Sequence, residues 1–164
     1  MRLEPCQVGD IHDLEEFLGR VDLTASGLDS PTARLWIERD PTGAIVASAG
    51  YELSADGVHV LIRSVAVTPR LRSGGRGAEA ARFALHQASQ EGVRRAWLFS
   101  RRSGPFWQSL GFLPADRDDL AVALAGTEQV RPFHARASSS ARSHGHANRA
   151  SEAFEPMRQP STRH

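Results

Sequence analysis

Arginine and glycine gather in one short segment, residues 70–77, between two stretches with regular patterns. The stretch before it, residues 58–67, is dense in β-branched residues and predicts a largely buried strand, which Pro69 would end. The stretch after it, from Ala78 to Gly92, repeats alanine and leucine at helical spacing. The start of a helix carries unpaired N–H groups and partial positive charge, so a strand, glycine turn and helix in this order suit a phosphate.

The order of residues inside this turn narrows the chemistry. The segment Arg72-Ser-Gly-Gly75-Arg-Gly77 fits the pattern Arg/Gln-x-x-Gly-x-Gly/Ala. Gly75 and Gly77 would permit positive φ and let the backbone close on a pyrophosphate. The turn lacks the Gly-Lys-Ser/Thr of a P-loop, and Ala80 stands where a dinucleotide fingerprint needs its third glycine. An ordinary glycine-rich turn fits the same residues, and the placement between a strand and a helix favours an anion site.

The surrounding chain supplies the elements that would position this turn. We expect a helix from Asp10 to about residue 21, then a loop at residues 23–31 that either borders a substrate mouth or only connects. Tight turns at residues 40–43 and 54–57 separate successive antiparallel strands. The predicted later elements are strands at 34–38, 44–53 and 95–100, a short helix starting at 103–105, a helix near 119–124 and a strand at 127–133.

Composition limits the class of protein. The chain of 164 residues is long enough for one domain with its own core. A formal net charge of +1 argues against bulk nucleic-acid binding, and no apolar run is long enough to span a membrane. Cys6 is the only cysteine, so a reducing cytoplasm is the expected compartment, and we expect no signal peptide.

The composition changes after residue 133. We expect one domain at residues 1–133 and a disordered tail at residues 134–164, because Ser, Ala, Arg and His dominate there without a hydrophobic period. The His144-Gly-His146 pair invites a metal interpretation, but it has no cysteine or carboxylate beside it. A solvated tail without a metal is therefore the preferred interpretation.

Taken together, these features resemble the GNAT superfamily of N-acetyltransferases. The order of elements, the glycine turn and Phe106-Trp-Gln-Ser-Leu-Gly-Phe112 match that superfamily. The resemblance implies an α/β (mixed α+β) fold whose mainly antiparallel mixed sheet is splayed between its fourth and fifth strands and flanked by helices. Shorter segments resemble the acetyltransferases of bacterial arsenic-resistance operons, which acetylate arsinothricin and phosphinothricin; these are Gly50-Tyr-Glu52, Leu61-Ile-Arg-Ser-Val-Ala-Val67, Gly92-Val-Arg-Arg95 and Leu110-Gly-Phe-x-Pro114-x-Asp-Arg117.

The resemblance implies acetyl-CoA as cosubstrate and no metal. Main-chain groups of Val65, Ala66 and Val67 would pair with the pantetheine, and one backbone N–H would polarise the thioester carbonyl. Arg70 or Arg76 would reach the 3′-phosphate. The other residues implied for the cofactor are Arg72, Ser73, Gly74, Gly75, Gly77, Ala78 and Phe106.

Two charged residues are candidates for contacting the amine that would receive the acetyl group. Glu52 would take the proton of the attacking amine, directly or through water; alternatively it is an exposed strand glutamate. Arg63 would clamp the substrate's carboxylate or phosphinate; alternatively it forms a cross-strand ion pair with Glu52. Ser64, also assigned to substrate binding, should face away from Arg63 unless a bulge changes the register.

The chain also departs from the superfamily pattern. Trp107 stands where many members have a tyrosine that protonates the CoA thiolate, and an indole is no practical acid. Arg76 replaces a usual aliphatic residue in the turn. We therefore expect direct acetyl transfer to a small amine in a ternary complex, with a protein or peptide acceptor and a catalytically impaired CoA-binding domain as alternatives. A homodimer is possible, and no nucleic-acid or membrane partner is expected.

Overall fold

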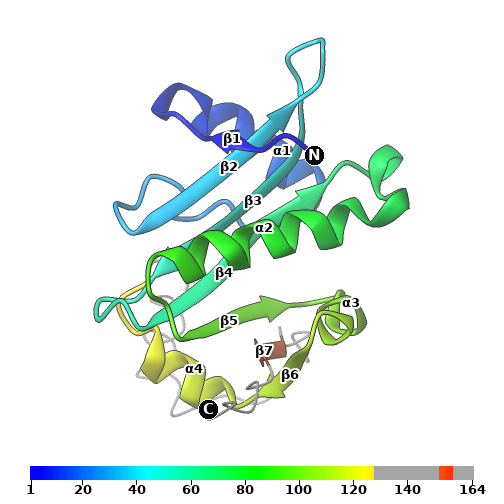
Figure 1. Ribbon diagram of the computed structural model, residues 1–164. Coiled ribbons are helices and arrows are strands. Elements are labelled where there is room, and N and C mark those ends of the chain that lie inside the picture. The colour runs from blue at the N-terminus through cyan, green and yellow to red at the C-terminus, as the bar shows by residue number, and fades with distance from the viewer. Residues whose placement is uncertain (128–151, 157–164) are drawn as a thin grey trace, which may run out of the picture.

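The structure is a computed structural model that describes residues 1–127 and the strand at residues 152–156 (Figure 1). Its described strands form one sheet in the order β1-β2-β3-β4-β5-β7-β6. The strands are β1 (Glu4–Pro5), β2 (Ala33–Arg39), β3 (Ile45–Leu53), β4 (His59–Val67), β5 (Arg95–Ser100), β6 (Phe112–Ala115) and β7 (Glu152–Pro156). Only the β4–β5 pairing is parallel among these strands, so the predicted mainly antiparallel mixed sheet is confirmed.

Helices cover both faces of the sheet. In Figure 1, α2 (Arg76–Gln90) crosses β3 and β4 on the near face, while α1 (Ile11–Arg20) lies behind the sheet. Two short helices, α3 (Gly104–Ser109) and α4 (Arg117–Ala123), follow β5 and β6. Single turns precede α1 and α2; they are η1 (Val8–Asp10), η2 (Pro69–Leu71) and η3 (Ser73–Gly75). None of the helices in the described ranges has the length and apolar character needed to cross a bilayer.

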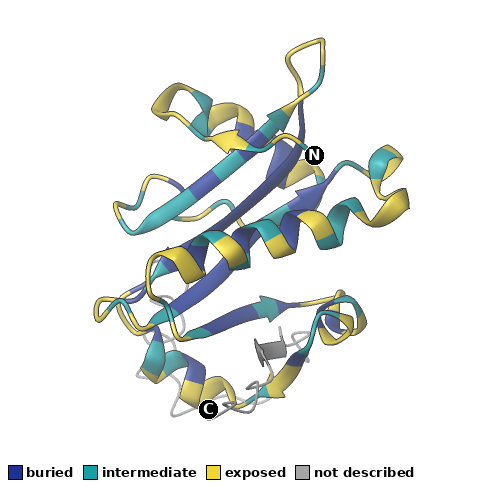
Figure 2. Ribbon diagram, in the orientation of Figure 1, coloured by how far each residue is buried: buried dark blue, intermediate teal, exposed yellow. Residues whose placement is uncertain are grey.

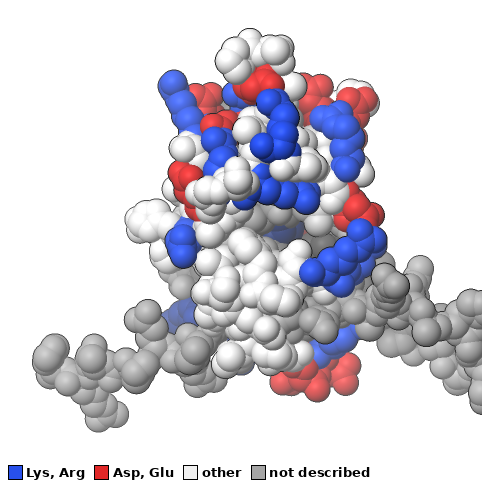
Figure 3. Space-filling view, turned by 90° about the vertical axis from the view of Figure 1, so that its right-hand side faces the viewer, with Lys and Arg blue, Asp and Glu red and all other residues white. Residues whose placement is uncertain are grey.

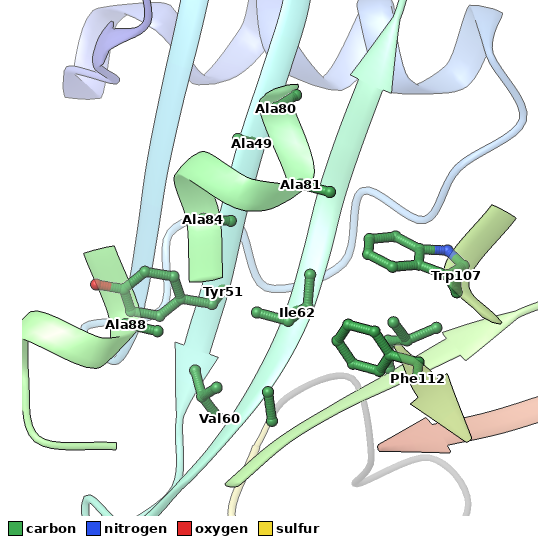
Figure 4. Packing of buried hydrophobic residues seen from close by; sticks show 12 residues of the cluster. Ala49, Tyr51, Val60, Ile62, Ala80, Ala81, Ala84, Ala88, Trp107 and Phe112 are labelled. Atoms are coloured by element: carbon green, nitrogen blue, oxygen red, sulfur yellow. The ribbon is translucent and has the colours of Figure 1, made fainter. Parts of the chain in front are cut away.

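The core beneath α2 explains why this helix can lie so close to the sheet. Four fully or nearly fully buried alanines face β3 and β4, where they pack with Tyr51, Val60 and Ile62 (Figure 4). The alanines are Ala80, Ala81, Ala84 and Ala88. Because their side chains are small, backbone approaches backbone and the start of the helix is held against β4. Figure 2 shows the buried positions running along the central strands while the outer face of α2 is exposed.

The two parallel strands part midway. Their pairing runs from His59 opposite Arg95 to Ile62 opposite Leu98. Beyond that point β4 continues through residues 63–67 without pairing to β5. The predicted splay between the fourth and fifth strands is therefore present, and it leaves one edge of β4 with main-chain groups that β5 does not take.

Strand β7 corrects the prediction of a wholly disordered tail. Residues 152–156 pair antiparallel with both β5 and β6, with Phe154 opposite Leu98 on one side and Pro114 on the other. Five residues are too few to show a hydrophobic period in the sequence, but pairing with a strand on each side satisfies the hydrogen-bonding groups of their backbone. Residues 128–151 and 157–164 lie outside the described residues, and with them the predicted strand at 127–133, apart from Thr127, and the His144–His146 pair.

Candidate active site

A β-bulge marks the place where β4 leaves β5. On the β3 side, Gly50 pairs with Arg63 and Ser48 pairs with Ala66, so Ala49 faces two residues, Ser64 and Val65. Ser64 has a left-handed φ of +56°. The bulge reverses the alternation beyond it, because Val65 packs against the core under α2 whereas Ala66 packs on the α1 side. Simple alternation from Arg63 therefore fails at this point.

A buried hydroxyl holds the bulge from the neighbouring strand. Ser48 is fully buried, and its Oγ donates a hydrogen bond to the carbonyl oxygen of Ser64 at 2.6 Å. Sequence analysis missed Ser48, since its position opposite the bulge depends on a register shift that no spacing rule reveals. The bulge carbonyl is thus turned toward β3 and satisfied there.

The glycines that adopt positive φ in the turn are not the predicted pair, because Gly74 takes this conformation and Gly77 does not. Gly74 and Gly75 have φ of +75° and +77°, and α2 begins directly afterwards at Arg76, two residues before the predicted start. Gly77 lies inside the first turn of α2 without positive φ. A Cβ placed on Gly77 would meet the Phe106 ring at 3.6 Å, so α3 stands beside the start of α2. The start of α2 therefore lies beside α3, which follows β5, and we call the place where β4 and β5 part beyond Ile62 and Leu98 the gap.

The arginines of the turn are held by other protein groups. Arg72 Nε donates to the carbonyl oxygen of Val67 at 3.0 Å and so ties the turn to the end of β4. Arg76 Nη2 lies 2.6 Å from Glu38 Oε2, and Arg70 Nη2 lies 3.0 Å from Asp40 Oδ2. Figure 3 views this end of the molecule, where arginine and acidic side chains intermingle above an uncharged area. Neither Arg70 nor Arg76 is thus an unpaired charge.

Glu52 and Arg63 form a buried ion pair. Arg63 Nη1 lies 3.3 Å from Glu52 Oε2, with side-chain exposures of 1% and 0%. The interpretation of Glu52 as an exposed strand residue is wrong, and the cross-strand ion pair is present. Burial lowers the pKa of Arg63, and the Glu52 charge opposes that shift.

The ion pair is joined to the predicted loop at residues 23–31. Arg63 Nη2 donates to the carbonyl oxygen of Ser26 at 2.5 Å, and Thr32 Oγ1 donates to Glu52 Oε1 at 3.4 Å. Arg63 Nε is buried without a hydrogen-bond partner in the described part of the chain. The loop is therefore more than a connector, because it contacts a buried guanidinium whose Nε has no hydrogen-bond partner among the described residues.

Trp107 lies in an apolar setting at the other side of the gap. Its ring extends from α3 toward β4 and packs edge-to-face on Phe106 and Phe112, with centroid separations of 5.1 Å and 5.4 Å (Figure 4). The chain's single tyrosine, Tyr51, donates to Glu91 Oε1 just beyond the last turn of α2. No tyrosine therefore occupies the place of the usual thiolate acid.

The single cysteine is also remote from the gap. Cys6 follows the edge strand β1, and its backbone N–H donates to the Leu35 carbonyl. Burial raises the pKa of the Cys6 thiol to about 11. At neutral pH this thiol is protonated, which makes it a poor nucleophile.

A separate hollow of about 610 Å³ opens at the β1–β2 edge of the sheet. It is lined by Arg2, Glu4, Pro5, Gln7, Asp10, Ile37, Glu38 and Arg39. Strands β2 and β3 lie between this hollow and the gap beside β4, so it is not part of the candidate site. Among residues 1–127, no three His, Cys, Asp or Glu side chains gather where they could hold a metal ion.

Comparison with known proteins gives one family. A sequence model described as the acetyltransferase (GNAT) family matches residues 5–112, a segment that includes the bulge, the glycine turn and Trp107. No curated protein matches the chain.

Solved structures share the fold at low identity. N-acetylglutamate synthase from Neisseria gonorrhoeae, complexed with coenzyme A and N-acetyl-glutamate, has a TM-score of 0.65 and 17% identity, covering 94% of this chain and 34% of that one. Rv2747 from Mycobacterium tuberculosis, in complex with CoA, has a TM-score of 0.69 and 12% identity, covering 97% and 100%. Tetrahymena GCN5 has a TM-score of 0.62 and 8% identity, covering 95% of each chain. The present chain spans about a third of the Neisseria synthase.

Proposed function

Because this chain belongs to the acetyltransferase (GNAT) family, we propose that it moves an acetyl group from acetyl-CoA to the primary amine of a small amino-acid-like molecule. The transfer is direct, within a ternary complex. The observation that carries the proposal is the parting of β4 from β5 after Ile62 and Leu98, next to the start of α2. A gap in a sheet beside a helix start accepts an extended thioester and its pyrophosphate together.

The donor side is built mainly from backbone. Pantetheine pairs with the free edge of β4 at residues 65–67, and a backbone N–H there polarises the thioester carbonyl. The pyrophosphate lies against the amides of residues 73–78. The residues fit this group, because a Cβ built on Gly74 or Gly75 meets no atom within 4 Å, which leaves the backbone open to approach. Arg72 holds the turn in place through Val67.

The acceptor side uses the buried ion pair. Arg63 offers Nε to the acceptor's carboxylate or phosphinate, and Glu52 accepts the amine's proton through water. The amine nitrogen then attacks the thioester carbon, the carbon–sulfur bond breaks, and the electron pair leaves with sulfur. A thiol of pKa about 8.5 is a tolerable leaving group, so Trp107 needs only to donate a hydrogen bond. The protonated, remote Cys6 argues against an acyl-enzyme.

The choice of acceptor rests on two further supports. The segments that resemble arsenic-resistance acetyltransferases make arsinothricin and phosphinothricin the first acceptors to test, with acetyl-CoA drawn from the cytoplasm. The Neisseria structure, which shares the fold, is complexed with an N-acetylated amino acid. Both support a compact amine that carries an anionic group, which the buried Arg63 can bind.

A thiol-release assay tests the proposal. Purified protein is mixed with acetyl-CoA, a thiol reagent and a panel containing phosphinothricin, arsinothricin, free amino acids and short peptides. We expect saturable release with one amino-acid-like amine and none with its N-acetylated form. Thiol release with peptides alone would show that the acceptor is a protein or peptide and not a small amine.

A second candidate is a domain that binds CoA without turnover. The Arg76–Glu38 pair and the absence of a tyrosine at the gap favour it. Calorimetry separates the two functions, since this candidate binds acetyl-CoA but releases no thiol with any amine of the panel. Absence of CoA binding would contradict both functions.

A further inference from the structure

Ser64 carries two features that each lower the stability of the fold. Its φ of +56° is a conformation that residues with a side chain rarely adopt. The residue is 7% exposed, and its hydroxyl oxygen is buried without a hydrogen-bond partner in the described part of the chain. Buried hydroxyls are normally hydrogen-bonded, so this one requires an explanation.

A glycine at this position would remove both features. The bulge needs an extra residue with positive φ, and glycine supplies that without strain or an unpaired hydroxyl. Strained residues with unpaired polar groups gather where proteins bind ligands. The serine side chain is therefore best explained by a partner that arrives with the substrate.

The position of Ser64 identifies that partner. It lies within residues 63–67, the part of β4 that does not pair with β5, between Arg63 on the amine side and residues 65–67, which the proposed function assigns to pantetheine. In the proposed function the thioester carbonyl receives a hydrogen bond from the backbone alone, and the chain's single tyrosine, Tyr51, is bound to Glu91, so a hydroxyl beside the bulge would supply a second donor. Ser48 fixes the carbonyl of Ser64 at 2.6 Å and thereby the direction of the bulge.

We propose that the Ser64 hydroxyl donates a hydrogen bond to the thioester of bound acetyl-CoA, and that Ser48 is the positioning residue that holds Ser64 for this contact. The inference rests on the proposed function. During transfer the new carbon–nitrogen bond forms, the carbon–sulfur bond breaks with its electron pair on sulfur, and the amine's proton passes to Glu52 or water. Ser64 keeps its own proton and stabilises the charge that develops on the thioester.

The test uses the full chain with Ser64→Ala, Ser64→Gly and Ser48→Ala. Ser54→Ala is the matched control, because Ser54 is also a buried, hydrogen-bonded serine of the same hairpin, at the end away from the gap. Each protein is measured by thermal unfolding without ligand, by calorimetry with acetyl-CoA and with CoA, and by steady-state kinetics.

We expect Ser64→Gly to unfold at a higher temperature than the wild type and yet to turn over more slowly. Ser64→Ala should weaken acetyl-CoA binding about two- to tenfold while leaving CoA binding unchanged, as loss of one neutral hydrogen bond predicts. Ser48→Ala should lower kcat with little change in the KM for acetyl-CoA. Ser54→Ala should lower stability without changing kcat.

Three results would overturn the inference. One is an equal affinity of wild type and Ser64→Ala for acetyl-CoA with unchanged kcat, and another is a loss confined to the KM of the amine. The third is a Ser48→Ala protein with wild-type turnover. In all three the wild type still binds CoA, so the proposed function survives; a wild type that binds neither nucleotide refutes both.

Discussion

At the scale of single residues, the Glu52–Arg63 pair joins stability to the candidate chemistry. Both side chains are essentially removed from water and lie 3.3 Å apart across the β3–β4 ladder. A buried charge is tolerated only when its partner is present, so neither residue is replaceable alone. Arg63 directly precedes the bulge at Ser64, so the ion pair lies at the edge of the gap.

Glu52→Leu and Arg63→Met should each lower the free energy of unfolding by about 3–5 kcal/mol, because each leaves one buried charge uncompensated. The double variant Glu52→Leu/Arg63→Met should be more stable than either single variant. Denaturant unfolding of all four proteins gives the coupling energy. In the exposed Arg2–Glu4 pair, Glu4→Gln should change stability by less than about 1 kcal/mol. Strictly additive effects at Glu52 and Arg63 would show that the two charges are not coupled.

Tyr51 offers a pH-dependent readout of the α2 packing. Burial, and then the hydrogen bond to Glu91, raise the pKa of its phenol above the ordinary value of about 10. The folded state therefore favours the neutral phenol, so this contribution is complete below pH of about 10 and is lost as the pH rises through the folded-state pKa.

Because Tyr51 is the only tyrosine, phenolate absorbance during a pH titration reports this residue alone. We expect ionisation to occur only above the range of an unfolded control in denaturant. Tyr51→Phe should flatten the alkaline fall in stability of the folded protein. A titration that coincides with the unfolded control would contradict the buried Tyr51–Glu91 contact.

At the scale of elements, the turn before α2 depends on two glycines in the left-handed region, Gly74 and Gly75. Gly77 serves differently, since it lies within α2 beside Phe106. Gly74 and Gly75 are needed for their backbone conformation, whereas Gly77 lies close to the Phe106 ring. Substitution by alanine should therefore affect Gly77 differently from the other two.

Gly75→Ala and Gly43→Ala should each destabilise the fold by about 1–2 kcal/mol, since both positions have positive φ with open space around them. Only Gly75→Ala should also weaken CoA binding, because Gly43 lies in the β2–β3 turn. Gly77→Ala should raise stability by up to about 1 kcal/mol and retain binding. Thermal unfolding and calorimetry on the three variants decide this, and equal loss of binding in Gly43→Ala would refute the assignment of the turn.

At the scale of the whole molecule, the sheet closes through a strand from far along the chain. Strand β7 inserts between β5 and β6, so both depend on it for one set of ladder hydrogen bonds. Through β5, this arrangement supports the far side of the gap. The segment after residue 133 is therefore part of the fold at residues 152–156.

Ala153→Pro should destabilise the protein by about 3 kcal/mol or more, because proline removes a backbone donor from a strand with neighbours on both sides. Ala153→Gly keeps that donor and should have a smaller effect of about 1 kcal/mol. Comparing the two by denaturant unfolding isolates the backbone hydrogen bond. Equal stabilities would show that β7 is not held between β5 and β6.

The sequence predicted the helix–strand order from α1 to α3 and a short helix near α4, because hydrophobic periods, turn residues and the arginine-glycine segment are local signals, but it predicted neither β1 nor β6. It also predicted that Glu52 and Arg63 would lie on adjacent strands. It did not predict β7 or Ser48, nor which glycines need positive φ, since these depend on residues that meet only after the chain has folded.

The sequence by itself determined the family, the strand–turn–helix unit and the absence of a tyrosine from the late aromatic helix, for each is written in neighbouring residues. Only the tertiary structure decided that Arg76 pairs with Glu38, that Glu52 is buried against Arg63, and that Ser64 lies strained at the bulge. The physical reason is that burial, register and charge pairing are set by contacts between distant segments, and these contacts decide which side chains remain available for a substrate.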